Sequence, residues 1–192
     1  MKKHIKLLSV FLASAILISM SSITSAANEV IAKYTSSKIL VDNVEVAFEA
    51  YNIGGSNYFK LRDIAYQFSP QDAFFSPYYG FEVIWDGKLN AINIIKTGDW
   101  DDSMYTPVGG ELAKGDGKDK KAVPCKSSIY LNGEPISLTA YNIGGNNYFK
   151  LRDLGAALDF AVDWDEENKT VIVCSYMSQD FYDEIKAEQE QF

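Results

Sequence analysis

The sequence predicts an α+β fold built from two tandem repeats, and three observations support this prediction. First, 47% of the 192 residues are hydrophobic and 14% are aromatic, so most of the chain can bury enough apolar surface to fold. Second, a thirteen-residue block at 51–63 recurs at 141–153 with a single difference, Ser56 against Asn146. Third, strand-forming segments surround one short stretch of helical periodicity in each copy.

Each repeat begins with strands that meet at a glycine-rich turn. Residues 44–51 and 136–141 are rich in the β-branched and aromatic side chains that favour strands. The sequence Ile-Gly-Gly-Ser/Asn-Asn then follows, and its glycines and asparagines can adopt positive φ. In the first copy the chain returns as a strand at 58–61, with Phe59 and Leu61 on one face. This pattern predicts a hairpin that ends in a buried strand.

A short helix and a second hairpin complete each repeat. Residues 62–68 and 152–158 place apolar side chains at helical spacing. Asp63 and Asp153 fall in the first turn of these helices, where a carboxylate interacts favourably with the helix dipole. The final hairpin pairs 81–85 with 91–95 in the first copy and 160–164 with 170–174 in the second. Each copy therefore reads as three strands, a helix and two strands.

These elements define the predicted domain boundaries. The flanks at 38–49 and 128–139 agree only at Ile39 and Ile129, so the thirteen-residue block has changed less than its surroundings. Either folding or binding could preserve the block, and the sequence leaves both explanations open. The predicted segments are a signal peptide at 1–27, a first repeat at 36–97, a linker or long hairpin at 98–127, a second repeat at 128–175 and an acidic tail at 176–192.

The first 27 residues have the layout of a secretory signal peptide. Three lysines precede an apolar run at 7–20, and small residues follow at 24–27. The run is shorter than the roughly 20 residues that a membrane span needs, and no later stretch could span a bilayer. We therefore expect a secreted, extracellular protein, either released or held at the cell surface without a covalent anchor.

Signal removal would leave an acidic chain without histidine. The chain has 18 basic and 26 acidic residues, so loss of three lysines gives 15 against 26, a net charge of −11. Nucleic acid is a poor partner for such a chain. His4 is the only histidine and lies in the signal peptide, so triads and metal sites that need imidazole are excluded. We predict no metal site and no cofactor. Cys125 and Cys174 could form a disulfide or remain unpaired, and both alternatives stay open.

The repeated pattern resembles a known family. Asn-Tyr-Phe-Lys-Leu-Arg-Asp, a short helix, Phe-x-Val-x-Trp-Asp and a closing hairpin are similar to the copper amine oxidase N-terminal-like domain, also called a stalk domain. The resemblance covers residues 36–175 and implies, for each repeat, a five-stranded antiparallel sheet wrapped around one helix. The family occurs in secreted and surface proteins of Gram-positive anaerobes. It implies no copper site, because the histidine ligands of the oxidase have no counterpart here.

Two readings of the charged residues in the block are open. Lys60, Arg62 and Asp63, with Lys150, Arg152 and Asp153 in the second copy, could form an anion or carboxylate pocket. Alternatively, the arginine could tie the start of the helix to the sheet by forking onto a carboxylate or onto backbone carbonyls. We favour the structural reading, because charges at a strand–helix junction commonly hold the junction together.

An aromatic insertion in the first copy supplies the candidate binding residues. Residues 69–80 have no counterpart in the second copy and contain four aromatic side chains, Phe74, Phe75, Tyr78 and Tyr79. Exposed aromatic side chains can stack on sugars or anchor a protein partner. The same side chains could instead fill the contact between the two repeats, and we consider packing the stronger alternative.

Two acidic runs are candidate calcium sites. One surrounds Trp100 at 99–102, and the other occupies 163–167. Calcium favours clustered carboxylates, but neither run has the loop spacing of a calcium-binding hand. We therefore expect solvated turns. Residues 109–121 are expected to be an exposed linker or the tip of a long hairpin, and residues 179–191 a frayed acidic helix.

These observations predict a non-catalytic surface module that acts as a spacer or an adhesin. The alternative is a carbohydrate- or cell-wall-binding module that uses the aromatic loop, with wall polysaccharide or another surface protein as the partner. A carboxylate-based hydrolase is disfavoured, because two small sheet-and-helix units offer little room for a cleft between paired acids.

Overall fold

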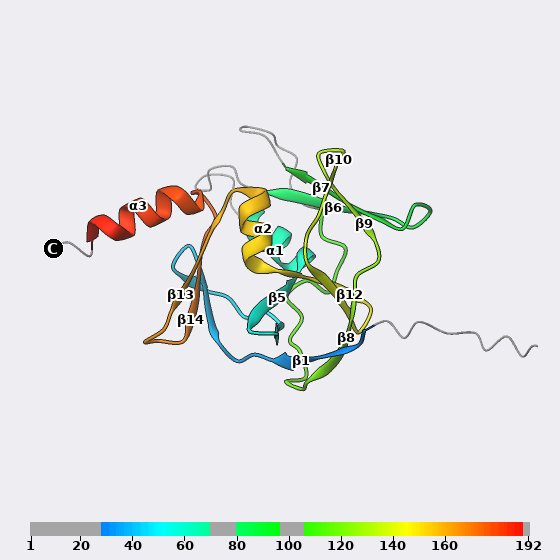
Figure 1. Cartoon of the computed structure of the whole chain (residues 1–192), viewed down its shortest axis with the longest axis horizontal. Coiled ribbons are helices and arrows are strands. Elements are labelled where there is room, and N and C mark those ends of the chain that lie inside the picture. The colour runs from blue at the N-terminus through cyan, green and yellow to red at the C-terminus, as the bar shows by residue number, and fades with distance from the viewer. Residues whose placement is uncertain (1–27, 70–79, 97–105, 190–192) are drawn as a thin grey trace, which may run out of the picture.

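Six strands close into a β-barrel at the centre of the fold. The structure is a computed structural model that describes residues 28–69, 80–96 and 106–189. The predicted signal peptide lies outside these residues. The barrel order is β1-β4-β5-β12-β11-β8, and all neighbouring strands are antiparallel (Figure 1). These strands are Val30–Tyr34 (β1), Ala50–Ile53 (β4), Ser56–Lys60 (β5), Lys120–Pro124 (β8), Ala140–Ile143 (β11) and Asn146–Lys150 (β12).

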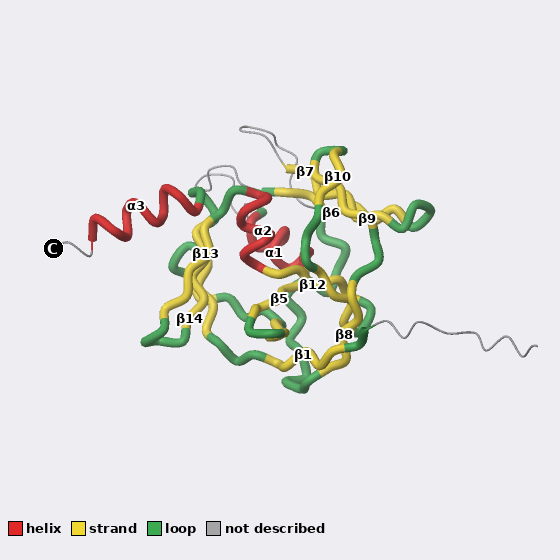
Figure 2. Tube along the Cα trace, viewed as in Figure 1, coloured by secondary structure: helices red, strands yellow, loops and turns green. Residues whose placement is uncertain are grey.

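Two four-stranded sheets flank the barrel. The first has the order β10-β9-β7-β6 and the second β13-β14-β2-β3. Their strands are Lys38–Val41 (β2), Val44–Glu45 (β3), Phe81–Asp86 (β6), Ala91–Lys96 (β7), Ser128–Leu131 (β9), Glu134–Ile136 (β10), Ala161–Asp165 (β13) and Thr170–Cys174 (β14). Figure 2 shows the hairpin β13–β14 on one side of the barrel and β6, β7, β9 and β10 on the other. The predicted α+β class and both predicted closing hairpins are therefore present.

The separate five-stranded sheet expected for each repeat is not confirmed, because every sheet combines strands from both copies. In the barrel, β5 of the first copy pairs with β12 of the second. In the outer sheets, β7 runs parallel to β9, and β14 runs parallel to β2. Each closing hairpin thus completes a sheet started by the other copy, and the two repeats are intertwined.

The pairing registers reveal an internal pseudo-twofold symmetry. Phe59 lies opposite its own repeat counterpart Phe149, and Tyr58↔Lys150 mirrors Lys60↔Tyr148. The symmetry extends to strands outside the predicted repeats. β1 lies before residue 36, whereas β8 lies inside the predicted linker, and the two strands are ninety residues apart and pair with each other. The structural repeat therefore begins earlier than its sequence motif, at a strand whose sequence differs between the copies.

Local sequence explains the hairpin and helix within each repeated block. Gly54 and Gly55 have φ of 59° and 83°, and Gly144 and Gly145 have φ of 58° and 87°, values that favour glycine. The chain then enters helices Leu61–Phe68 (α1) and Leu151–Leu158 (α2), each one residue longer than predicted. Helix α2 ends at Asp159 in the left-handed conformation, whereas α1 leads into the aromatic insertion.

Two apolar cores result from this arrangement. The larger one contains both helices together with side chains from the outer sheets, and Phe59, Phe149 and Leu154 are among its most buried members. The smaller core fills the barrel with twin residues from the two copies: Ala32 and Ala122, Ile53 and Ile143, Tyr58 and Tyr148, and Tyr51, with its half-buried twin Tyr141 packed against it. Alternate side chains of one strand therefore enter different cores, as Tyr58 and Phe59 show.

A third helix follows the second repeat. Helix Gln179–Gln189 (α3) projects from the body of the fold (Figure 1) and has no buried residue. Gln179 accepts a hydrogen bond from the backbone N–H of Val162, and Lys186 forms an ion pair with Asp163 on β13. Among the described residues no helix has the length and apolar character needed to cross a membrane. Cys125 and Cys174 are half-buried and are not joined in a disulfide.

Candidate functional site

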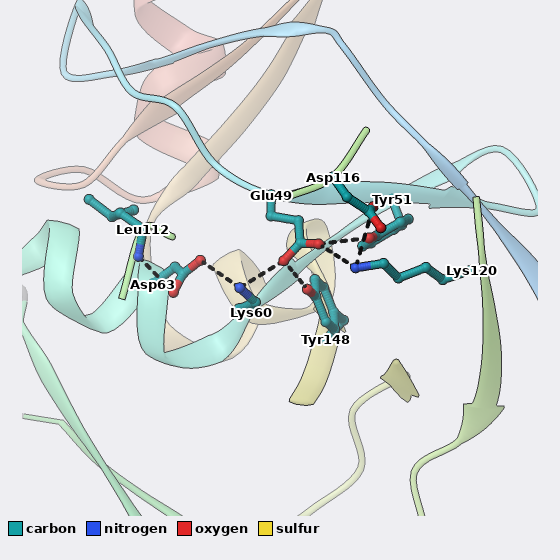
Figure 3. Close-up of polar contacts among 8 residues, drawn as sticks. All are labelled: Glu49, Tyr51, Lys60, Asp63, Leu112, Asp116, Lys120 and Tyr148. Atoms are coloured by element: carbon teal, nitrogen blue, oxygen red, sulfur yellow. Dashed lines mark hydrogen bonds and ion pairs between the residues drawn. The ribbon is translucent and has the colours of Figure 1, made fainter. Parts of the chain in front are cut away.

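A buried charged network joins the two copies at one end of the barrel. Its centre is Glu49, which precedes β4 and is 6% exposed. One carboxylate oxygen accepts hydrogen bonds from the Tyr51 hydroxyl at 2.8 Å and the Lys120 ammonium at 2.9 Å. The other contacts the Lys60 ammonium at 2.8 Å and accepts a hydrogen bond from the Tyr148 hydroxyl at 2.9 Å (Figure 3). We call these five residues, with Asp63, the Glu49 network.

The network extends through Lys60 to Asp63 on α1. Asp63 is 1% exposed, and its Oδ2 lies 3.9 Å from the Lys60 ammonium without a hydrogen-bond partner. Its Oδ1 accepts a hydrogen bond from the backbone N–H of Leu112 at 3.1 Å. Burial raises the pKa of Asp63, and the contacts with Leu112 and Lys60 oppose this shift only in part. Lys60 therefore holds two buried carboxylates together.

The segment expected to be an exposed linker covers the network. Leu112 contacts Asp63, Asp116 lies 3.7 Å from the Lys120 ammonium, and Lys120 begins β8. A Cβ atom at Gly115 would come within 2.7 Å of the Glu49 carboxylate, so only glycine fits there without a shift. The described part of this segment is therefore structural, because it supplies both a barrel strand and the lid over Glu49.

The network exists in only one half of the pseudo-symmetric fold. The position of Glu49 is occupied by Thr139 in the second copy, and that of Lys120 by Val30 in the first. On the Thr139 side, Asp153 pairs with Lys150 at 3.2 Å and accepts a hydrogen bond from Thr139. The same Lys-x-x-Asp motif is thus half-exposed in one copy and buried in the other, because the residues that surround it, Glu49, Lys120 and Leu112, come from outside the block.

The four donors keep Glu49 ionised. Burial by itself would raise the pKa of Glu49, but hydrogen bonds from two ammonium groups and two phenols outweigh it and lower the pKa to about 2. Burial, followed by the hydrogen bond to Glu49, raises the pKa of Tyr51 to about 12, so this phenol remains a donor. A carboxylate has about four acceptor positions, and all four are occupied by protein donors. Glu49 therefore acts as a structural tie between the copies.

This shift predicts an acid-dependent loss of stability. Because the folded-state pKa of Glu49 lies below its ordinary value of 4.5, its contribution is complete above that pH and is lost as pH falls towards about 2. We expect the free-energy difference between the wild type and Glu49→Gln to shrink by about 3 kcal/mol over this interval. Urea denaturation of both proteins across this pH range measures the difference in their unfolding free energies. A constant difference would contradict the prediction.

The intertwined repeats form two related surface clefts. The Arg62 cleft has a volume of about 470 Å³ and the Arg152 cleft about 650 Å³. Most residues that line one cleft are the repeat counterparts of residues that line the other. Shared lining positions include Arg62 and Arg152, Trp85 and Trp164, and Asn147 and Asn57.

Each cleft needs both copies to form. The Arg62 cleft combines the helix start and hairpin of the first copy with the Gly-Gly turn of the second, represented by Gly145 and Asn147. The Arg152 cleft reverses these contributions, with Gly55 and Asn57 from the first copy. A cleft of this kind follows from the exchange of strands between repeats, so no single repeat could contain it.

The structure separates the residues of the charged motif. Lys60 and Asp63 line the Arg62 cleft from the buried side and belong to the Glu49 network, whereas Tyr58 is buried inside the barrel. Neither Arg62 nor Arg152 forms a hydrogen bond or ion pair with any described residue, so the expected structural tie through arginine is not observed there. Arg62 is half-exposed, and Arg152 is exposed.

The remaining predicted sites are the aromatic insertion and the two acidic runs. Phe74, Phe75, Tyr78 and Tyr79 lie outside the described residues, as does the acidic run at 99–102. In the second acidic run, Asp165 accepts hydrogen bonds from Asn168, and Glu166 contacts Lys169 and the indole of Trp164. Across residues 28–69, 80–96 and 106–189, no group of three or more His, Cys, Asp or Glu side chains could hold a metal ion.

Sequence reasoning missed Glu49, Lys120 and both clefts. One local signal was available for Glu49, since it is the only charged residue between Val46 and Ile53 and its repeat counterpart is Thr139. The clefts had no such signal, because their walls come from segments roughly eighty residues apart in the chain. No family model, curated protein or solved structure matches the chain.

Proposed function

We propose that this chain is a secreted, non-catalytic surface module that adheres to a surface polymer through the Arg62 and Arg152 clefts. The observation that carries the proposal is the reuse of the same block positions in both clefts, which the repeat counterparts relate to each other. A duplicated polymer-binding site gains avidity without new contacts when a repeating ligand engages both sites. A pure spacer would need the intertwined barrel but no open clefts.

The exposure of the cleft residues also supports adhesion. Trp85, which lines the Arg62 cleft, is 45% exposed. Exposed apolar and aromatic side chains next to unpaired polar groups are typical of recognition surfaces. Meanwhile the residues of the block that fold the barrel, such as Tyr58 and Phe59, are buried and cannot touch a partner. The block therefore serves architecture with some positions and lines a surface cleft with others.

Filling the clefts is expected to abolish adhesion without unfolding the protein. Ser56 and Asn146 are counterparts at the turns that line the two clefts, and neither is buried. We expect Ser56→Tyr or Asn146→Tyr to reduce co-sedimentation of the secreted chain with purified cell wall, and the double variant to abolish it. Unfolding free energy should change by less than about 0.5 kcal/mol, as for other surface substitutions.

Glu45→Tyr is the matched control, because it adds the same side chain at an exposed position outside both clefts. A wild-type chain that does not sediment with wall fractions would overturn adhesion and leave the spacer role. If the double variant still sediments but Phe75→Ala with Tyr79→Ala does not, the aromatic insertion is the adhesive element instead of the clefts.

A further inference from the structure

The unsatisfied polar groups of the two clefts are mainly donors. In the Arg62 cleft, the side-chain oxygen of Asn142 accepts the Gly145 N–H, and that of Asn147 accepts the Asn142 amide. Glu111 in the same cleft accepts the backbone N–H groups of Val108 and Gly109. The side-chain acceptors of Asn142, Asn147 and Glu111 are thus already occupied by protein donors. The exception in this cleft is the buried Asp63 Oδ2, which has no hydrogen-bond partner among the described residues and lies 3.9 Å from the Lys60 ammonium.

The Arg152 cleft repeats this arrangement. The side-chain oxygen of Asn52 accepts the Gly55 N–H, and that of Asn57 accepts the Asn52 amide. Asp163 accepts from the Trp164 backbone and from Lys186. Because these amide and carboxylate acceptors are occupied, apart from the buried Asp63 Oδ2, a ligand that mainly donates hydrogen bonds would find few partners.

The guanidinium groups of both clefts are donors without an acceptor in the described part of the protein. Arg62 and Arg152 each carry five N–H donors, and neither bonds to a described residue. The side-chain amides of Asn147 and Asn57 face the same clefts and donate no hydrogen bond to the described part of the chain. A planar guanidinium fork matches the two oxygens of a carboxylate.

From this donor excess we infer that the clefts bind a carboxylate-bearing polysaccharide, with Arg62 and Arg152 each holding one carboxylate. This inference rests on the proposed adhesive function and names its ligand. Trp85 and Val83 provide an apolar wall beside Arg62, as Trp164 and Val162 do beside Arg152. Such a wall suits a sugar ring that carries the acid.

The strand pattern favours a glycan over an extended peptide. A peptide that binds by strand addition needs a free strand edge. The barrel strands that line the clefts, β5 and β12, are hydrogen-bonded on both sides. In the Arg152 cleft, the N–H of Val162 on edge strand β13 is already donated to Gln179. Both clefts therefore offer side-chain donors, but a free strand edge for strand addition is not a feature common to both.

The overall charge limits how densely the ligand can be charged. The full chain has a formal net charge of −8, so a polymer with a phosphate on every unit would be repelled over most of the protein surface. Charges more than a Debye length away, about 8 Å at physiological salt, are screened. A glycan with occasional uronate units, separated by neutral sugars, can accept hydrogen bonds from the cleft donors and is only weakly repelled by the acidic surface.

Isothermal titration of the secreted chain tests this inference. The probes are a polysaccharide with dispersed glucuronate units, the same polymer after reduction of its carboxyls, a poly(glycerol phosphate) and a glutamate-rich peptide. We expect the acidic glycan to bind and the phosphate polymer and the peptide not to bind. The carboxyl-reduced glycan should bind about 10- to 100-fold more weakly, as for loss of a charge-assisted hydrogen bond.

Arginine variants locate the binding groups. Arg62→Gln and Arg152→Gln should each weaken binding at least about tenfold, and the double variant should abolish it. Arg→Lys at both positions keeps the charge but loses the fork, so it should recover only part of the affinity. Lys88→Gln removes an exposed cation outside both clefts and serves as the matched control.

Other outcomes would overturn the inference separately from the adhesive function. Equal binding of the carboxyl-reduced glycan, preference for the phosphate polymer or the peptide, or full affinity in the double arginine variant would each reject a carboxylate ligand. If the chain sediments with wall but shows one of these results, adhesion stands and only the ligand class is wrong. If it does not sediment at all, the proposed function itself fails.

Discussion

Replacing Glu49 by alanine is expected to lower the free energy of unfolding by about 3–5 kcal/mol, the usual cost of removing one partner from a buried ion pair. The substitution would leave the Lys60 ammonium, which is 11% exposed, beside Asp63 without its principal counterion. It would also leave the hydroxyl of the buried Tyr148 without its acceptor. Guanidinium denaturation of wild type and variant measures the loss.

Glu45→Ala is the matched control for this substitution. Glu45 pairs with Lys38 at 3.3 Å, but its side chain is 66% exposed. An exposed ion pair contributes about 0–1 kcal/mol, so the control should remain close to wild-type stability. If Glu49→Ala cost no more than Glu45→Ala, the Glu49 network would not be what ties the two copies together.

Phe149→Ala is expected to destabilise the protein by a similar amount, about 3–5 kcal/mol, because it opens a cavity in the larger core. Phe149 is 0% exposed and lies opposite Phe59 where β5 and β12 pair across the pseudo-twofold. Truncation there removes contacts to both copies at once. Thermal or denaturant unfolding of the variant gives the magnitude.

Two further substitutions check the physical reason for this effect. Phe59→Ala, at the counterpart position and 1% exposed, should produce a comparable loss because the two rings occupy related positions. Phe181→Ala on α3 removes the same ring where it is 53% exposed, so the loss should stay below about 1 kcal/mol. Strongly unequal effects of Phe59→Ala and Phe149→Ala would argue against an energetically symmetric core.

Local structure was predictable wherever neighbouring residues alone determine it. The two helices follow from apolar side chains at helical spacing, and Leu154 and Leu158 are buried on the predicted face. The Gly-Gly turns follow from positive φ at residues such as Gly54 and Gly144, which glycine adopts without strain. The closing hairpins were predicted because alternating apolar residues surround short polar turns.

The pairing between strands was not predictable in the same way. Strands β1 and β8 were missed because their sequences differ and lie outside the repeated motif. A strand exposes the same backbone donors and acceptors to any partner, so its sequence does not say which strand will pair with it. One sheet per repeat was predicted because strands that follow each other in the sequence often pair. In the structure, however, β7 pairs with β9 and β14 with β2, so strands of different repeats pair.

In the candidate site, too, the local motif was predictable and its surroundings were not. Lys60, Arg62 and Asp63 were recognised as a charged motif, yet their roles depend on surroundings that come from distant segments. Glu49 neutralises Lys60, and Leu112 covers Asp63, whereas Arg62 is left to face a cleft. In the second copy the same motif surrounds Thr139, and Asp153 stays half-exposed.

By itself, the sequence determined the duplication, the α+β class, the helices, the turns and the acidic character of this chain, because each depends on nearby residues or on composition. Only the tertiary structure decided that the copies exchange hairpins, that one acid becomes the buried tie between them, and that two clefts form across their boundary. These features arise from contacts between distant segments: 99 residues separate Glu49 from Tyr148, and 133 separate Asp42 from Ser175 beside the pairing of β2 with β14. Such contacts depend on which surfaces are brought together when the barrel closes. The two copies of the motif have nearly the same sequence, so the difference between their surroundings arises only in the folded protein.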